Sequence, residues 1–216
     1  MKTKIMKIAG ACLTLVMLVA ALGVIAGIGT VEAEAVLAPT EYGGCDGNHS
    51  GYTALGGDEG AVIKSAGNYY LTSDLHESVY EASLKIQAKG TITICLNGYN
   101  IYHEGYCVRV IDITPTKGDL TINFCDCTAN GEIYHEAKNS GIDVMSSDYA
   151  TTINLYGITI RDCSSGVGLD DDTTVNMYSG TIKNCGYYAF ALTEENEKLN
   201  IYGGNIINNT EGIRVC

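Results

Sequence analysis

Apolar and polar residues alternate in short segments that recur along the second half of the chain. The clearest segments, each with an Asn between two apolar residues, are residues 121–124, 152–155, 174–177 and 198–201. Their asparagines stand at positions 123, 154, 176 and 200. Alternation with a period of two predicts strands. Repetition at intervals of about 20–50 residues is typical of solenoids.

Two more apolar segments follow each Asn and predict two more strands per repeat. Aligning the repeats on the Asn puts Ile160, Ile182 and Ile206 in one column, and residues 167–169, 189–191 and 213–215 in another. The repeat at Asn123 fits with a four-residue insertion near residues 125–128. An earlier repeat fits if Cys95 takes the Asn position and residues 108–110 form the third strand. We predict an all-β fold, a right-handed parallel β-helix, as a single-stranded solenoid of about five coils of roughly 22–31 residues with three short strands each.

The two ends of the chain depart from this pattern. Residues 1–35 combine three lysines, an uncharged apolar stretch and Ala-Glu-Ala at 33–35, which predicts a signal peptide. The stretch is also long enough to stay as an anchor. Residues 36–68 are Gly-rich and are expected to form an N-terminal cap, and residues 69–216 the β-helix. The sequence ends directly after an inward-facing residue, so we expect an open end, through truncation or end-to-end self-association.

The charge of the chain and its predicted signal peptide limit the partners and the location that we expect. The formal net charge is −12, and the predicted signal peptide carries more lysines than acidic residues. Such a surface repels the phosphates of nucleic acid and of anionic membranes. We therefore expect a secreted or cell-surface protein with no nucleic acid partner and no membrane span after signal cleavage.

Eight of the nine cysteines lie beyond residue 35, an even number that predicts disulfides in an exported chain. Cys163 and Cys185 share a column in adjacent coils, and a strand spacing of about 4.8 Å permits a disulfide. Parallel in-register strands strain such a bond, so free thiols are the alternative. Cys125 and Cys127 form a C-x-C pair with no second pair at zinc-site spacing, so zinc is not expected.

Two outward features are candidate binding sites. Tyrosines follow three of the asparagines by two residues, and ring faces beside amides suit sugar rings and hydroxyls, although such a row can also serve stability alone. The glycan-binding candidates are Tyr156, Tyr178, Tyr202, Asn154, Asn176 and Asn200. Acidic residues after the third strands are expected to gather along one edge, as calcium ligands or as solvated turns. The calcium candidates are Asp148, Asp170, Asp171, Asp172, Glu194 and Glu195.

Two segments resemble a paired signature of known proteins. They are AGNYYLTSD at residues 66–74 and ICLNGYNI at residues 94–101. CDGNH at residues 45–49 with YTAL at residues 52–55 resembles the segment that often precedes this signature, with Tyr52 where Trp is common. Over residues 43–216 the chain is similar to exported right-handed parallel β-helix proteins of Gram-positive anaerobic bacteria. The resemblance implies an adhesin-like or carbohydrate-binding surface protein.

We therefore predict an exported cell-surface module that binds glycan, host or matrix, or acts as a spacer in a larger surface protein. A polysaccharide lyase or glycoside hydrolase of the pectate-lyase-like fold is the alternative, which requires paired carboxylates or calcium with a base. Arg109 and Arg214 are expected to share an outward column, but four coils apart, and the four histidines to share none. The Gly-His-Gly and Arg-Ile-Lys motifs of these enzymes are absent. We assign no catalytic residue.

Overall fold

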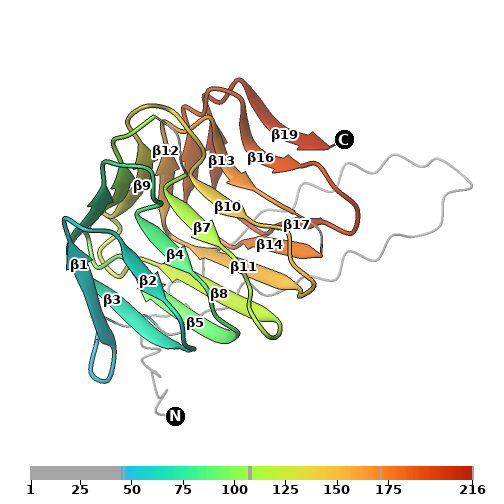
Figure 1. The fold of residues 1–216 in the computed structure, drawn as a ribbon. Helices are drawn as coiled ribbons and strands as arrows, with labels where there is room; N and C mark the ends of the chain where they lie inside the picture. Colours follow the sequence, from blue (N-terminus) through green and yellow to red (C-terminus); the bar gives the residue numbers. More distant parts are fainter. Residues whose placement is uncertain (1–44, 46, 107–108, 171, 216) are drawn as a thin grey trace, which may run out of the picture. The chain divides into compact units, whose positions relative to one another are not determined.

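Beyond the first four strands, paired strands are three positions apart in the chain. The computed structural model describes residues 45, 47–106, 109–170 and 172–215, so the predicted signal peptide lies outside the described residues. The described part of the chain contains strands and no helix, and therefore no helix suited to crossing a membrane. The strands pair in parallel into two sheets, one of 12 strands and one of seven (Figure 1). This all-β stack of parallel strands is consistent with a β-solenoid.

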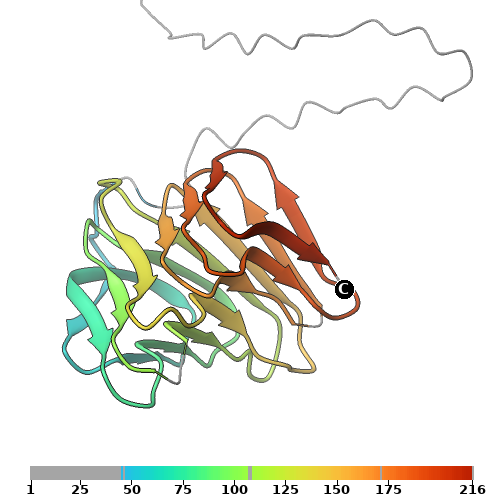
Figure 2. The ribbon, with the colours of Figure 1, turned by 90° about the horizontal axis from the view of Figure 1, so that it is seen from above.

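The strands form three faces, because the larger sheet passes from the first face to the second within one long strand, β3. The first face holds β1 (Thr53–Gly57), β3 (Gly67–Glu77), β5 (Gly90–Cys95), β8 (Leu120–Cys125), β11 (Thr151–Tyr156), β14 (Thr173–Met177) and β17 (Lys198–Ile201). The second face starts at the end of β3 and continues with β6 (Ile101–His103), β9 (Glu132–His135), β12 (Thr159–Arg161), β15 (Thr181–Lys183) and β18 (Asn205–Ile207). The third face holds β2 (Ala61–Ile63), β4 (Leu84–Ile86), β7 (Ile111–Ile113), β10 (Ile142–Val144), β13 (Ser165–Gly168), β16 (Tyr188–Leu192) and β19 (Glu211–Val215). Figure 2 views the same stack from above.

Aliphatic columns fill the interior between the faces. Ile153 pairs with Ile122 and Val175, and Val175 pairs with Leu199, as the alternation predicted. Ile122, Ile153 and Val175 are fully buried. A single repeat leaves both sides of these side chains open to water, so the stacking of repeats buries them. Each Å² of apolar surface buried in this way stabilises the fold by about 25 cal/mol.

The structure corrects the predicted register at three places. Thr93, not Cys95, pairs with Asn123, and Cys95 pairs with Cys125. The third strand of that repeat is β7, three residues later than predicted. Its Ile111 and Ile113 are buried, and Asp112 between them is only partly buried. In β16, Phe190 rather than Ala189 pairs with Val167, although both are buried. At each place the apolar residues fit the interior in more than one register.

The N-terminal region and the last repeat differ in how they are covered. Within the region predicted as a cap, β1 pairs in parallel with β3 and β2 pairs with β4. At the other end, inward apolar side chains of β17 and β19 lie open, with Ile201 44%, Ile213 46% and Val215 73% exposed. The inward residues of the last repeat are thus the least covered of their columns.

Candidate functional site

The tyrosine row predicted from the sequence is present on the first face. The ring centroids of Tyr156 and Tyr178 lie 4.8 Å apart with planes at 2°, and those of Tyr178 and Tyr202 lie 4.9 Å apart at 10°. Exposure rises along the row, from 9% for Tyr156 to 45% for Tyr202. The rings cover one another's faces. What this row offers a ligand is therefore ring edges and hydroxyls, rather than flat platforms.

The asparagines beside this row bond to one another. The side-chain nitrogen of Asn154 donates to the oxygen of Asn123, Asn176 donates to Asn154, and Asn200 donates to Asn176, each at 2.8 Å. Asn123 ends the row by donating to the Thr93 hydroxyl at 3.3 Å. Each bond uses one N–H and one oxygen lone pair of an amide that can make more. The amide row thus has a structural role that any ligand contact would have to share.

The acidic residues gather only in part. Asp148, Asp172, Glu194 and Glu195 line one groove of about 470 Å³, whereas Asp170 lines another and Asp171 lies outside the described residues. Burial, followed by the charges of Asp170 and Glu194, raises the pKa of nearby Glu197. Among the described residues, these carboxylate oxygens form no group close enough to share one ion. Calcium binding therefore stays a prediction.

Cys163 and Cys185 are unbonded thiols in the structure. The Cys163 thiol donates to the Arg161 carbonyl at 3.2 Å, and the Cys185 thiol to the Lys183 carbonyl at 3.8 Å. Burial raises the pKa of both, that of Cys185 to about 11. This is the free-thiol arrangement, and such protonated, buried sulfurs are poor nucleophiles.

The expectations for arginine and histidine columns were wrong. Arg214 shares its column with Ala191, Gly168 and Asp143, and Arg109 lies before β7, with its guanidinium 3.4 Å from both Asp112 and Asp143. The register error at β7 explains the difference. His103 and His135 do share a column, with ring centroids 5.1 Å apart in the interior. The Nδ1 of His103 accepts from the Gly105 N–H, and its Nε2 faces the Glu81 carbonyl.

A second stacked row, which the sequence analysis missed, lies on the second face. The rings of His76 and Tyr102 stack at 4.9 Å, and those of Tyr102 and Tyr134 at 5.0 Å. The Arg161 guanidinium covers Tyr134 at 4.0 Å. Since the two rows are built alike on different faces, one provides an internal control for the other.

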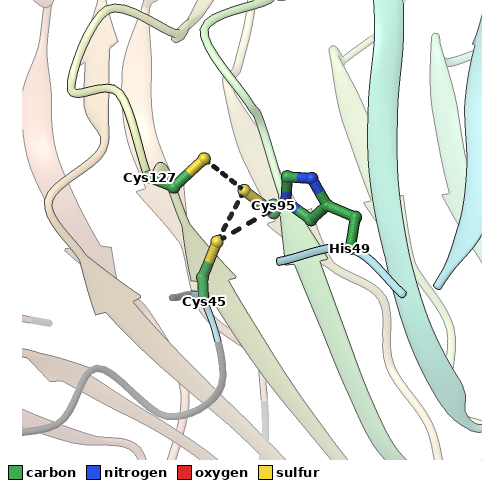
Figure 3. Close-up of side chains that lie close together, drawn as sticks. All are labelled: Cys45, His49, Cys95 and Cys127. Carbon is green, nitrogen blue, oxygen red and sulfur yellow. Dashed lines mark hydrogen bonds between the residues drawn. The ribbon is translucent and has the colours of Figure 1, made fainter. Parts of the chain in front are cut away.

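A cluster of thiols and an imidazole lies beside the first face, and its members are far apart in the sequence. Cys45 and His49 precede β1, Cys95 ends β5, and Cys127 follows β8 (Figure 3). Their ligand atoms all lie within 4.8 Å of one another. The Cys95 Sγ is 2.8 Å from the Cys45 Sγ and 3.6 Å from the Cys127 Sγ, and the Cys45 Sγ is 3.8 Å from the His49 Nε2. We call these four residues the Cys₃His cluster.

Packing and hydrogen bonds fix the members of this cluster. The His49 ring stacks on Tyr70 with centroids 4.5 Å apart and meets the edge of Tyr52 at 5.3 Å. The Asp126 carboxylate accepts from the backbone N–H groups of Gly98, Thr128 and Gly131, which shapes the loop that carries Cys127. Although burial opposes it, these donors hold the pKa of Asp126 below its usual value.

The thiols of this cluster differ in their pKa values. Hydrogen bonds, first from Cys125 and then from Cys45, lower the pKa of Cys95 to about 4, whereas burial raises that of Cys45 to about 12. The cluster thus favours a thiolate at the buried central sulfur. Three thiols and an imidazole are a donor set that zinc binds tetrahedrally. The expectation against zinc considered only cysteine pairs close in sequence. Cys95 pairs with Cys125, which stands two residues before Cys127. The misplaced register hid this pairing, and with it the closeness of Cys95 and Cys127.

Comparison with known proteins adds no assignment. No protein-family model matches the chain, and neither a curated protein nor a solved structure matches it. The resemblance based on residues 66–74 and 94–101 therefore stays a prediction.

Proposed function

We propose that this chain is an exported cell-surface module, a right-handed parallel β-helix whose first face binds glycan. The fifteen strands β5 to β19 divide into five sets of three, which supports a count of five coils. Right-handed winding follows from the strong preference of parallel crossovers. The signal-like N-terminus and the acidic composition support an extracellular location.

The observation that carries this proposal is the stacked row of Tyr156, Tyr178 and Tyr202 at the ends of three adjacent strands. Their stacked faces leave edges and hydroxyls, so the row would bind a glycan chain through hydrogen bonds to its hydroxyls and edge contacts with its ring hydrogens. Repetition at the strand spacing suits a ligand that is itself a repeating polymer.

The hydroxyl groups can be tested without disturbing the stack. Tyr178→Phe keeps the ring, and Tyr102→Phe makes the same change in the row on the second face. Retention on immobilised polysaccharides is expected to fall several-fold in Tyr178→Phe and in Tyr178→Ala, and to be unchanged in Tyr102→Phe. Equal retention by all three variants would remove the row as a glycan site. A chain that binds nothing on a broad glycan array would instead be a spacer.

One groove favours the enzyme alternative. Arg109, Asp143, Asp170 and Tyr188 line a groove of about 420 Å³ on the third face. Burial raises the pKa of Asp143 despite the Arg109 charge, and a shifted carboxyl in a groove is a feature of catalytic sites. A lyase acting there would release unsaturated product from pectin-like substrates, which absorbance of the new double bond detects. Asp143→Asn would abolish that signal.

A further inference from the structure

We propose that Cys45, His49, Cys95 and Cys127 bind one zinc ion, which fastens the N-terminal segment to the side of the stack. This inference is independent of glycan binding. It rests on the convergence of four soft or borderline ligand atoms within 4.8 Å of one another, from three separate segments of the chain.

The distances fit a metal with small movements. Zinc–sulfur bonds of about 2.3 Å in a tetrahedron place two thiolates about 3.8 Å apart. The two sulfurs of Cys95 and Cys127, 3.6 Å apart, are already close to this value. A sulfur and a nitrogen on one zinc lie about 3.5 Å apart, and the Cys45 Sγ is 3.8 Å from the His49 Nε2. Cys45 and Cys95, at 2.8 Å, have to move apart by about 1 Å, which side-chain rotation can supply.

The surroundings match a bound cation. His49 is oriented by Tyr70, as metal-binding histidines are held by neighbouring groups. Three thiolates and one imidazole select zinc or another thiophilic ion over calcium or magnesium, which prefer oxygen. On binding, Zn²⁺ displaces the remaining thiol protons to solvent and leaves the site with one negative charge.

A disulfide is the competing outcome. Exported proteins commonly oxidise paired cysteines, and Cys45 and Cys95 are the pair with the closest sulfurs here. A Cys45–Cys95 bond would remove two ligands and abolish the zinc site. The two outcomes are therefore exclusive in one molecule and can be separated by measurement.

The test uses the full chain, purified under reducing conditions and incubated with Zn²⁺ alone. Mass spectrometry of the metal is expected to give one zinc per chain after excess ion is removed. Co²⁺ in its place should give thiolate charge-transfer absorption and the visible bands of a tetrahedral ion. Cys127→Ser, at an exposed position, should reduce zinc retention and lower the charge-transfer intensity by about one third.

Further variants distinguish a built site from surface binding. Cys95→Ser should lose stoichiometric zinc, and His49→Phe, which keeps a ring against Tyr70, should weaken zinc at least about tenfold. Cys185→Ala removes a thiol outside the cluster and should bind zinc as the wild type does. The proposal is overturned if the wild type retains no zinc, whether its thiols are free or a Cys45–Cys95 disulfide is found. Equal zinc retention by the wild type, Cys127→Ser and His49→Phe also overturns it.

Discussion

Tyr156, the last residue of β11, and Tyr178, which directly follows β14, have ring planes only 2° from parallel and ring centroids 4.8 Å apart. That separation is the spacing of neighbouring strands. The stacked arrangement follows from the parallel register, which places the two side chains one strand spacing apart with the same orientation. The row is a product of the solenoid stack and contributes to it, whatever it binds.

Loss of the middle ring should therefore destabilise the fold. Tyr178 contacts a ring on each side, and each aromatic pair contributes about 0.5–1.5 kcal/mol. Tyr178→Ala is expected to lower the free energy of unfolding by about 2 kcal/mol, and Tyr178→Phe by less than about 0.5 kcal/mol. Urea titration measures both. Equal stability of the two variants would mean that stacking contributes nothing.

The amide row predicts a difference between its middle and its end. Asn154 both donates to Asn123 and accepts from Asn176, whereas Asn200 donates to Asn176 at the end of the row. Asn154→Ala removes one hydrogen bond from each of two partners and should cost about 2–3 kcal/mol, whereas Asn200→Ala removes one bond in all and should cost about 1 kcal/mol. Thermal unfolding of the two variants side by side tests this. A larger loss for Asn200→Ala would contradict the ladder.

The sequence predicted the stacked strands because burial of one side fixes the register. At Ile153 and Val175, polar neighbours leave one register that buries the apolar residues. Near Cys95 the pattern is ambiguous, since Ile92, Ile94 and Leu96 alternate and a two-residue slip keeps them all inward. Periodicity cannot choose between these registers, and in the structure Thr93 accepts the hydrogen bond from Asn123.

The Cys₃His cluster was beyond such reasoning for a different physical cause. Cys45 and His49 lie outside the strands, so no period relates them to Cys95. Their position depends on contacts that are distant in sequence, chiefly the stacking of His49 on Tyr70. Sequence periodicity places residues that belong to a repeat, whereas a segment packed against the side of the stack is located only by its tertiary contacts.

The Asp126 carboxylate is expected to stabilise the loop that follows β8. It accepts three backbone N–H groups and the Thr128 hydroxyl, and charged acceptors form the stronger hydrogen bonds. Asp126→Ala should lower the free energy of unfolding by about 2–3 kcal/mol. Asp148→Ala, at an exposed aspartate, should change it by less than about 0.5 kcal/mol. Similar losses in both variants would show that the acidic charge, and not the loop geometry, matters.

Asp143 provides a prediction for the pH dependence of stability. Burial raises its pKa in the folded protein, against the opposing charge of Arg109 and with a small contribution from Asp112. Below the ordinary carboxyl pKa the side chain is protonated in both the folded and the unfolded state, so its ionisation costs nothing. As the pH rises through the folded pKa, ionisation in the buried site lowers the stability of the wild type.

Asp143→Asn cannot ionise and therefore isolates this effect. The stability of the variant relative to the wild type is expected to increase from about pH 4 to about pH 7. Denaturant unfolding of both proteins at several pH values gives the difference directly, with pH effects common to both proteins cancelling. A difference that moves in the opposite direction would show that the Arg109 ion pair outweighs the burial of Asp143, and that the carboxylate is a stabilising partner and not a strained one.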